Sequence, residues 1–408
     1  MERPELLAPG GSLEKLKTAI DYGADAVYIG GEAFSLRVAA ENFSLEDMKE
    51  GLAYAHERGK KVYLTANILP HNEDIEEFEA FIEEIRPLGF DAVLIADLGM
   101  FDMMRELAPE IPVHISTQAN NINYRSALAW YKRGAKRVVL AREMSFDEIA
   151  QIRQKTPEEL ELEAFVHGAM CISYSGRCLL SNYMTGRDAN HGECAHPCRW
   201  NYSLVEQTRP GEYMDIVENE RGSFIFNSKD LCMIRHIPEL VQSGISSFKL
   251  EGRVKTSYYV ATVVGAYRRE IDRYLKDPEN YVFDEASYEE LCKVSHRPYT
   301  TGFYFGKPDR EAQVYTSSSY IRDYDLIGIV TAYDDQTKIA TLTQRNRFFE
   351  GDTIEVLCPD RPFFIQQAVG MTDEKGSPVE VANHAEMILH LPMQQPVTAG
   401  CMLRKERK

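Results

Sequence analysis

Residues 5–31 read ELLAPGGSLEKLKTAIDYGADAVYIGG and contain the unit from which most of the chain is built. A short apolar run (5–9) is followed by an amphipathic stretch of helical period (13–23) and by a second apolar run (26–31). Short apolar runs bounded by turn residues are typical of buried strands, and a glycine commonly ends a helix. The segment therefore predicts a strand, a helix and a second strand.

The same alternation continues to about residue 275. The further strand candidates are KVYLTAN (61–67), AVLIAD (92–97), VHISTQAN (113–120), RVVLARE (137–143), LEAFVHG (162–168) and SFKLEGR (247–253). Eight strand–helix alternations within roughly 250 residues favour a closed, TIM-like (β/α)8 barrel over an open doubly wound sheet. Neither the glycine-rich dinucleotide fingerprint nor the phosphate loop occurs in the sequence.

The domain boundaries follow from two places at which this alternation of strands and helices is interrupted. Almost 80 residues separate the seventh strand from the eighth, so we expect a barrel over 1–277 with a cysteine-rich insertion at 169–246. Residues 278–321 are interpreted as a connector. From 322 to 408 the sequence reads as short strands separated by turns, which predicts a small C-terminal all-β barrel domain.

Composition and charge exclude several classes of protein. The net charge of −17 argues against indiscriminate nucleic-acid binding, which depends on lysine and arginine neutralising phosphates. No segment approaches the roughly 20 apolar residues that span a bilayer, and the first residues lack the pattern of a signal peptide. We therefore expect a cytoplasmic protein without a membrane partner.

Five of the eight cysteines fall in the insertion region, and they are Cys171, Cys178, Cys194, Cys198 and Cys232. In a reducing compartment this spacing indicates metal binding instead of disulfides. Soft thiolates suit an iron–sulfur cluster, whereas the flanking His191 and His196 keep zinc open as an alternative. The other cysteines, Cys292, Cys358 and Cys401, are isolated in the sequence and are expected to be structural.

Several motifs resemble a known family. ELLAPGG, GADAVYIGG, EAFVHGAMCISYSGRCLLS, CRW and NSKDLC are similar to the collagenase-like peptidase family U32, and above all to its tRNA-hydroxylating branch. The resemblance covers essentially the whole chain. It implies a tRNA hydroxylase that works without molecular oxygen, forms 5-hydroxyuridine at the wobble position and takes the hydroxyl group from prephenate.

The resemblance also implies a 4Fe-4S cluster. Matched residue by residue, its ligands fall on Cys171, Cys178, Cys194 and Cys232. Cys198 is then a fifth thiol and an alternative ligand.

Polar residues near the ends of the predicted strands form the remaining candidate site, because barrel enzymes carry their chemistry at the C-terminal face. Catalytic roles are expected for His167, Lys249, Glu251 and Arg253. Substrate binding is expected for Arg37, Asn67, Gln118, Asn120 and Arg142, while Asp97 and Glu143 occupy similar positions. A small dicarboxylate needs cations, and the arginine fork suits carboxylates best. Structural hydrogen bonding is the alternative reading for each residue.

Two other functions stay open. A peptidase is the first, although the sequence has no HExxH zinc helix and no GxSxG elbow. The second is a non-catalytic iron–sulfur protein that presents tRNA to another enzyme. The sequence also leaves open a paralogous or homo-oligomeric partner.

Overall fold

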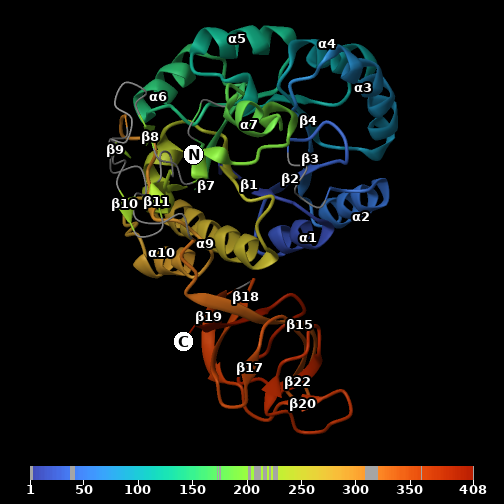
Figure 1. Ribbon diagram of the computed structural model, residues 1–408, viewed down its shortest axis with the longest axis vertical. Coiled ribbons are helices and arrows are strands. Elements are labelled where there is room, and N and C mark those ends of the chain that lie inside the picture. Colours follow the sequence, from blue (N-terminus) through green and yellow to red (C-terminus); the bar gives the residue numbers. More distant parts are fainter. Residues whose placement is uncertain are drawn as a thin grey trace.

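Figure 1 shows the computed structural model of the chain. It describes residues 3–36, 42–171, 173, 176–200, 204–205, 213–214, 218–219, 222–223, 228–307, 320–359 and 361–407. None of the helices in these ranges is long and apolar enough to cross a membrane.

Eight parallel strands form a closed barrel, as the sequence predicts. They are β1 (Glu5–Pro9), β2 (Ala26–Gly30), β3 (Lys61–Ala66), β4 (Ala92–Ile95), β5 (Val113–Ile115), β6 (Arg137–Val139), β7 (Glu161–Ala169) and β13 (Ser247–Leu250). Neighbouring strands pair in chain order from β1 to β7. The barrel closes because β13 pairs with both β7 and β1: Lys249 is in register with Phe165 on one side and with Leu7 on the other.

Helices cover the outside of the barrel (Figure 1). They are α1 (Leu13–Asp21), α2 (Leu45–His56), α3 (Asn72–Ile85), α4 (Leu98–Leu107), α5 (Tyr124–Arg133), α6 (Phe146–Lys155), α8 (Ile237–Gln242) and α9 (Ser257–Lys276). Side-chain caps define several starts: Ser44 and Ser145 each accept a hydrogen bond from the backbone three residues on and form capping boxes. The apolar helix faces and the strands share one core.

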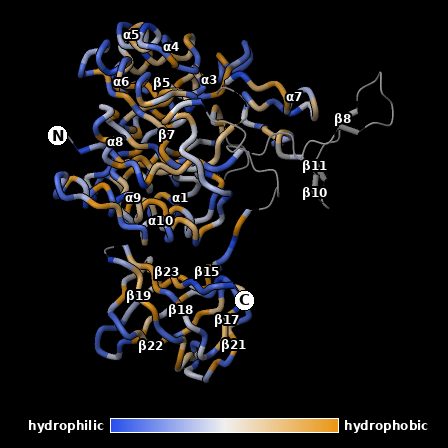
Figure 2. The backbone as a smooth tube through the Cα atoms, turned by 90° about the vertical axis from the view of Figure 1, so that its left-hand side faces the viewer, coloured by the Kyte–Doolittle hydropathy of each residue, from blue (hydrophilic) through white to orange (hydrophobic). Residues whose placement is uncertain are grey.

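The insertion lies at the end of the barrel opposite the N-terminus (Figure 2). It contains α7 (Leu180–Thr185), the short pairs β8 (Leu204–Val205) with β9 (Tyr213–Met214) and β10 (Glu218–Asn219) with β11 (Gly222–Ser223), and β12 (Asp230–Cys232). Strand β12 pairs antiparallel with the end of β7, and β14 (Tyr299–Thr300) then pairs with β12. The predicted connector therefore also contains α10 (Glu285–Cys292) and a strand of the barrel sheet.

The C-terminal region is all-β, as predicted. Seven strands form one sheet in the order β19 (Arg361–Gln367), β18 (Thr353–Cys358), β23 (Met402–Glu406), β15 (Tyr324–Asp334), β16 (Ile339–Gln344), β22 (Ile388–Pro392) and β20 (Thr372–Asp373). A small pair joins β17 (Phe348–Phe349) to β21 (Val381–Ala382). This domain has its own apolar core.

Buried ion pairs join the two domains. Arg404 on β23 is 0% exposed, and its guanidinium lies 2.5 Å from Glu290 Oε1 on α10 and 2.7 Å from Glu355 Oε2 on β18. Lys293 Nζ lies 2.9 Å from the same Glu355 carboxylate. Coulomb attraction is strong away from water, so these contacts fix the second domain against the barrel.

Replacing Arg404 with alanine is expected to destabilise the whole chain by about 3–5 kcal/mol, because it leaves two buried carboxylates without their main cation. Denaturant unfolding measures this change. Arg407→Ala, which removes an exposed pair with Asp325, serves as the control and should cost less than about 1 kcal/mol. Equal losses of unfolding free energy in the two variants would contradict the proposal that Arg404 joins the two domains.

Candidate functional site

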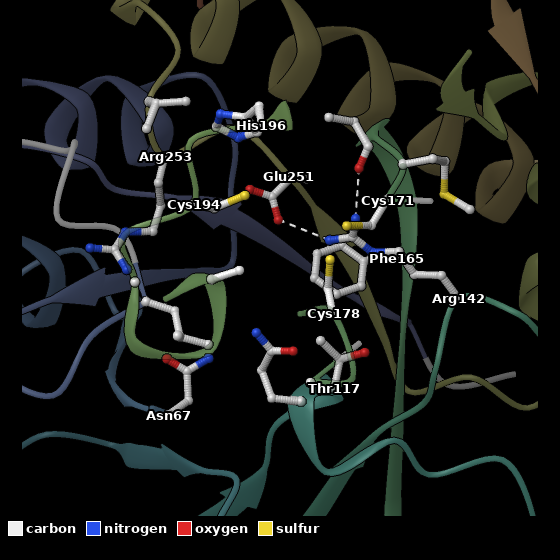
Figure 3. A pocket seen from close by; sticks show the side chains of 18 of the residues that line it. Asn67, Thr117, Arg142, Phe165, Cys171, Cys178, Cys194, His196, Glu251 and Arg253 are labelled. Carbon is white, nitrogen blue, oxygen red and sulfur yellow. Dashed lines mark hydrogen bonds and ion pairs between the residues drawn. The ribbon is translucent and has the colours of Figure 1, made fainter. Parts of the chain in front are cut away.

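A cavity of about 520 Å³ opens at the C-terminal mouth of the barrel. Its wall combines residues of the barrel, such as Phe165 on β7 and Asn67 directly after β3, with residues of the insertion (Figure 3). The C-terminal face is the position at which barrel enzymes bind their substrates. Barrel and insertion thus enclose one candidate site.

Four cysteines line this cavity: Cys171, Cys178, Cys194 and Cys198. Cys171 follows β7 and is exposed, and the other three are half-buried. Within the described residues, no three histidine, cysteine or acidic side chains converge closely enough to hold a single metal ion. The four thiols line the same cavity, and thiolates are the usual protein ligands of iron–sulfur clusters.

Cys232 lies apart from this cavity lining. It sits on β12 directly opposite His167 of β7 and is 7% exposed. Burial raises the pKa of its thiol to about 12, and the Tyr267 hydroxyl lies within hydrogen-bonding reach. Three of the four expected ligands, Cys171, Cys178 and Cys194, therefore line one cavity together with the alternative ligand, Cys198. Cys232 lies outside this lining, within hydrogen-bonding reach of Tyr267.

Basic side chains outnumber acidic ones in the cavity lining. Five cations line the cavity, with Glu251 as the one carboxylate among the described lining residues. The cations are Arg142, Lys249, Arg253, Lys255 and Arg297. Three of these cations are paired with carboxylates: Arg142 with Glu251, Lys249 with Glu163 and Arg297 with Asp230.

Arg142 and Glu251 form an ion pair on the wall. Arg142 Nη2 lies 3.0 Å from Glu251 Oε2, and Nη1 donates to the carbonyl oxygen of Ala169. The guanidinium also stacks 3.8 Å from the centre of the Phe165 ring. These contacts fix the Glu251 carboxylate at the cavity surface (Figure 3).

Arg253 reaches the cavity from the loop after β13. It is buried, and Nη1 donates to the hydroxyl oxygens of Ser35 at 2.5 Å and Thr65 at 3.2 Å. Its Nη2 donates to Asn42 Oδ1 at 3.3 Å. A Cβ at Gly30 would overlap Arg253 Nη2, which explains why β2 ends in glycine here. The guanidinium is thus held in one orientation by residues from the first third of the chain.

Lys249 occupies the barrel interior. Its Nζ lies 2.7 Å from Glu163 Oε1, and both side chains are buried. Arg137 lies 2.9 Å from the other oxygen of Glu163 and 2.6 Å from Glu5. Lys249 thereby joins a buried network beneath the cavity in which Glu163, Glu5 and Glu161 compensate the charges of Lys249 and Arg137.

His167 does not line the cavity. Its ring packs against Tyr259, Tyr267 and Tyr299, and Nδ1 lies 3.5 Å from the Tyr267 hydroxyl. Burial lowers the pKa of His167 to about 3, so the ring is neutral at physiological pH. Its position opposite Cys232 gives it a role in packing around that thiol.

The remaining candidates divide into two groups. Asn67 and Gln118 line the cavity, and Asn67 Nδ2 donates to Ser116 Oγ at 3.1 Å. Asn120, Asp97 and Glu143 lie outside the lining. Of these, Asp97 caps α4 by accepting from the Met100 amide. Arg37 falls outside the residues that the structure describes.

Two cations of the wall were missed as binding residues. Arg297, from the predicted connector, lies 3.2 Å from Asp230 and also contacts the Tyr320 hydroxyl. Lys255 lies 3.9 Å from the centre of the Tyr320 ring, and burial lowers its pKa. Lys255 belongs to the motif KLEGRVK, whereas no local pattern marks Arg297.

Comparison with known proteins gives full-length relatives. tRNA hydroxylation protein P1 of Bacillus subtilis (strain 168) is 41% identical over 404 residues, covering 99% of this chain and 95% of the relative. tRNA hydroxylation protein P of Escherichia coli (strain K12) is 36% identical, with 97% and 95% coverage. Collagenase of Porphyromonas gingivalis (strain ATCC BAA-308 / W83) is 32% identical, with 96% and 95% coverage.

Two family profiles match the chain in tandem. The profile for peptidase family U32 covers residues 11–314, which comprise most of the barrel and the insertion. The profile for the peptidase family U32 C-terminal domain covers residues 322–404, which comprise the second β-domain. The chain therefore belongs to peptidase family U32.

Proposed function

We propose that this protein is an oxygen-independent tRNA hydroxylase that forms 5-hydroxyuridine at the wobble uridine with prephenate as hydroxyl donor. The observation that carries the proposal is one cavity whose wall combines four cysteines with five cations. The names of two full-length relatives, both tRNA hydroxylation proteins, support the reaction class. Such a cavity beside the thiols also favours an enzyme over an accessory protein that would bury its cluster.

The thiols of the cavity fit a 4Fe-4S cluster in their chemistry. We assign Cys171, Cys178 and Cys194 as three of its ligands, since they line the same cavity and thiolates are the usual ligands of such clusters. When bound, the cluster would supply redox chemistry that protein side chains lack. Zinc remains the alternative occupant of the same thiols.

For the fourth ligand we retain Cys232, as the family resemblance implies. Cys232 on β12 is paired with His167 on β7, and Cys171 follows the end of β7 two residues after Ala169. Ligation by Cys232 requires its side chain to leave Tyr267, whereas Cys198 already lies on the cavity wall. Cys198 is therefore a specific competitor for this role.

The basic side chains of the cavity wall suit the carboxylates of prephenate. Arg253 presents a fixed guanidinium, and Lys255 and Arg297 extend the positive surface toward Tyr320. Glu251, oriented by Arg142, is the carboxylate that can take up a proton from a bound substrate. Asn67 and Gln118 offer amide groups for hydrogen bonds to the substrate.

An exposed apolar surface on the insertion is suited to RNA. Tyr183 on α7 is 86% exposed and the nearby Leu179 is 68% exposed. Arg177 and Arg187, also exposed, flank this segment. Aromatic side chains stack on unpaired bases, and arginines bind the adjacent phosphates. A base extruded from an anticodon loop next to this surface would have a short path to the cavity.

Replacing Tyr183 with alanine should weaken tRNA binding by roughly tenfold, because stacking on an aromatic ring contributes about 1–3 kcal/mol per base. Tyr183→Phe keeps the ring and should bind like the unaltered protein. Binding of labelled tRNA measures the difference. Unchanged affinity in Tyr183→Ala would remove α7 from the RNA interface.

Peptidase activity is the second candidate, favoured by the relative named collagenase and by His196, which lines the cavity together with Cys194 and Cys198. The two functions are separated by one assay. Anaerobically purified protein is incubated either with prephenate and tRNA lacking 5-hydroxyuridine or with denatured collagen. We expect 5-hydroxyuridine in the tRNA and intact collagen. Collagen cleavage that thiol alkylation abolishes, with unmodified tRNA, would support the peptidase.

A further inference from the structure

Two cysteines that are far apart in sequence meet inside the second domain. Cys358 ends β18 and Cys401 directly precedes β23, and their Sγ atoms lie 2.6 Å apart. Both residues are buried. Both are free thiols, and each lies within hydrogen-bonding reach of the other. Their separation along the chain offered no sign of this contact.

The surroundings of the pair favour an ionised sulfur. The backbone amide of Thr398 donates to Cys401 Sγ at 3.4 Å, and Arg361 Nη2 lies 3.8 Å from Cys358 Sγ. Donors and a nearby cation stabilise a thiolate, which is the species that attacks disulfides. The Thr398 amide donates to Cys401 and can stabilise its thiolate, which favours Cys401 as the attacking group.

The barrel holds the backbone on both sides of the pair. The Tyr22 hydroxyl lies 3.1 Å from the carbonyl oxygens of Leu357 and Gly400, the residues that precede the two cysteines. Tyr22 follows α1 and is buried. One side chain of the first domain thus fixes the separation of two segments of the second.

We propose that Cys358 and Cys401 are a reversible dithiol–disulfide pair, oxidised by a low-molecular-weight disulfide such as oxidised glutathione. The Cys401 thiolate attacks one sulfur of the oxidant and releases the first small thiol. Cys358 then attacks the mixed disulfide at the Cys401 sulfur and releases the second. Two electrons and the two cysteine protons pass to the oxidant, which leaves as two thiols.

A disulfide between Cys358 and Cys401 would stabilise the folded second domain. It closes the chain between residues 358 and 401, which includes β19, β20 and β22. Closing a loop of this length restricts the unfolded chain and so stabilises the folded domain. The exposed residues 398–399 lie beside Cys401, and opening of this turn gives the oxidant access. Oxidation would thereby strengthen a domain that is joined to the barrel through Tyr22 and Arg404.

The test uses the full chain, equilibrated anaerobically in buffers with different ratios of reduced to oxidised glutathione. After acid quenching, denaturation and alkylation, peptides are identified by mass spectrometry. We expect a cross-linked pair of peptides containing Cys358 and Cys401, lighter by two hydrogen atoms, whose fraction rises with oxidised glutathione. The midpoint temperature of thermal unfolding of the second domain should be higher by roughly 10 °C in the oxidised form.

Two serine variants sharpen this experiment. Cys358→Ser should lose both the cross-link and the thermal shift, whereas Cys292→Ser, on α10, should keep both. Alkylation of Cys358 and Cys401 at every glutathione ratio would overturn the proposal, and so would mixed glutathione adducts without the cross-link. Because the unaltered chain alone gives these results, the test does not depend on whether a variant folds.

Discussion

Serine at Cys171 or Cys178 is expected to abolish both the iron–sulfur cluster and 5-hydroxyuridine formation. Both side chains lie on the cavity wall, and a serine hydroxyl is a much poorer ligand for iron than a thiolate. Iron and labile sulfide counts on anaerobically purified protein should fall from four each to nearly none. Stoichiometric zinc without labile sulfide in the unaltered protein would contradict the assignment of the cluster.

Serine variants of the other cysteines complete this series. Cys232→Ser should lose the cluster, whereas Cys198→Ser and Cys292→Ser should retain it. The opposite result at Cys198 and Cys232 would give the fourth ligand to the thiol that already lies on the cavity wall. If Cys292→Ser lost as much iron as Cys232→Ser, the loss of iron would reflect general destabilisation of the protein and not the removal of a ligand.

Arg253→Ala is expected to lower kcat/KM for 5-hydroxyuridine formation at least about 100-fold while the cluster remains intact. The variant removes an oriented, buried guanidinium from the cavity wall, and loss of one such donor typically raises the barrier by about 2.7–4 kcal/mol. Nucleoside analysis with varied prephenate measures the effect, which should include a higher KM for prephenate.

Arg253→Lys is the matched control for this prediction. It keeps the positive charge but loses the planar fork, so its activity should lie between those of the alanine variant and the unaltered protein. Because Arg253 also bonds Ser35 and Thr65, iron content and thermal unfolding must be compared in both variants. Full modification by Arg253→Ala would remove this residue from the mechanism.

The barrel could be predicted because each of its strands is a local pattern. The apolar run at 5–9 is β1, and the runs at 26–31 and 61–67 match β2 and β3 closely. Strand ends were less predictable: β5 stops at Ile115, because Ser116 turns the chain by accepting a hydrogen bond from the Gln118 amide. Such ends depend on where pairing with the neighbouring strand stops.

Parts of the site depend on contacts that no local pattern reveals. The cysteine array is visible in the sequence because clustered thiols are rare. His167 was expected at a strand end, but β7 continues to Ala169 by pairing with β12, so the ring lies among the tyrosines. Arg297 reaches the cavity with the help of Asp230, which lies 67 residues earlier in the chain.

Mass spectrometry of tRNA nucleosides tests the central claim most directly. The tRNA is taken from cells that lack this protein and any paralogue, and from the same cells supplied with the unaltered chain or with Cys171→Ser. We predict that 5-hydroxyuridine is absent from the first, restored by the unaltered chain and still absent with the serine variant. Normal 5-hydroxyuridine in the cells that lack the protein would contradict the hydroxylase account.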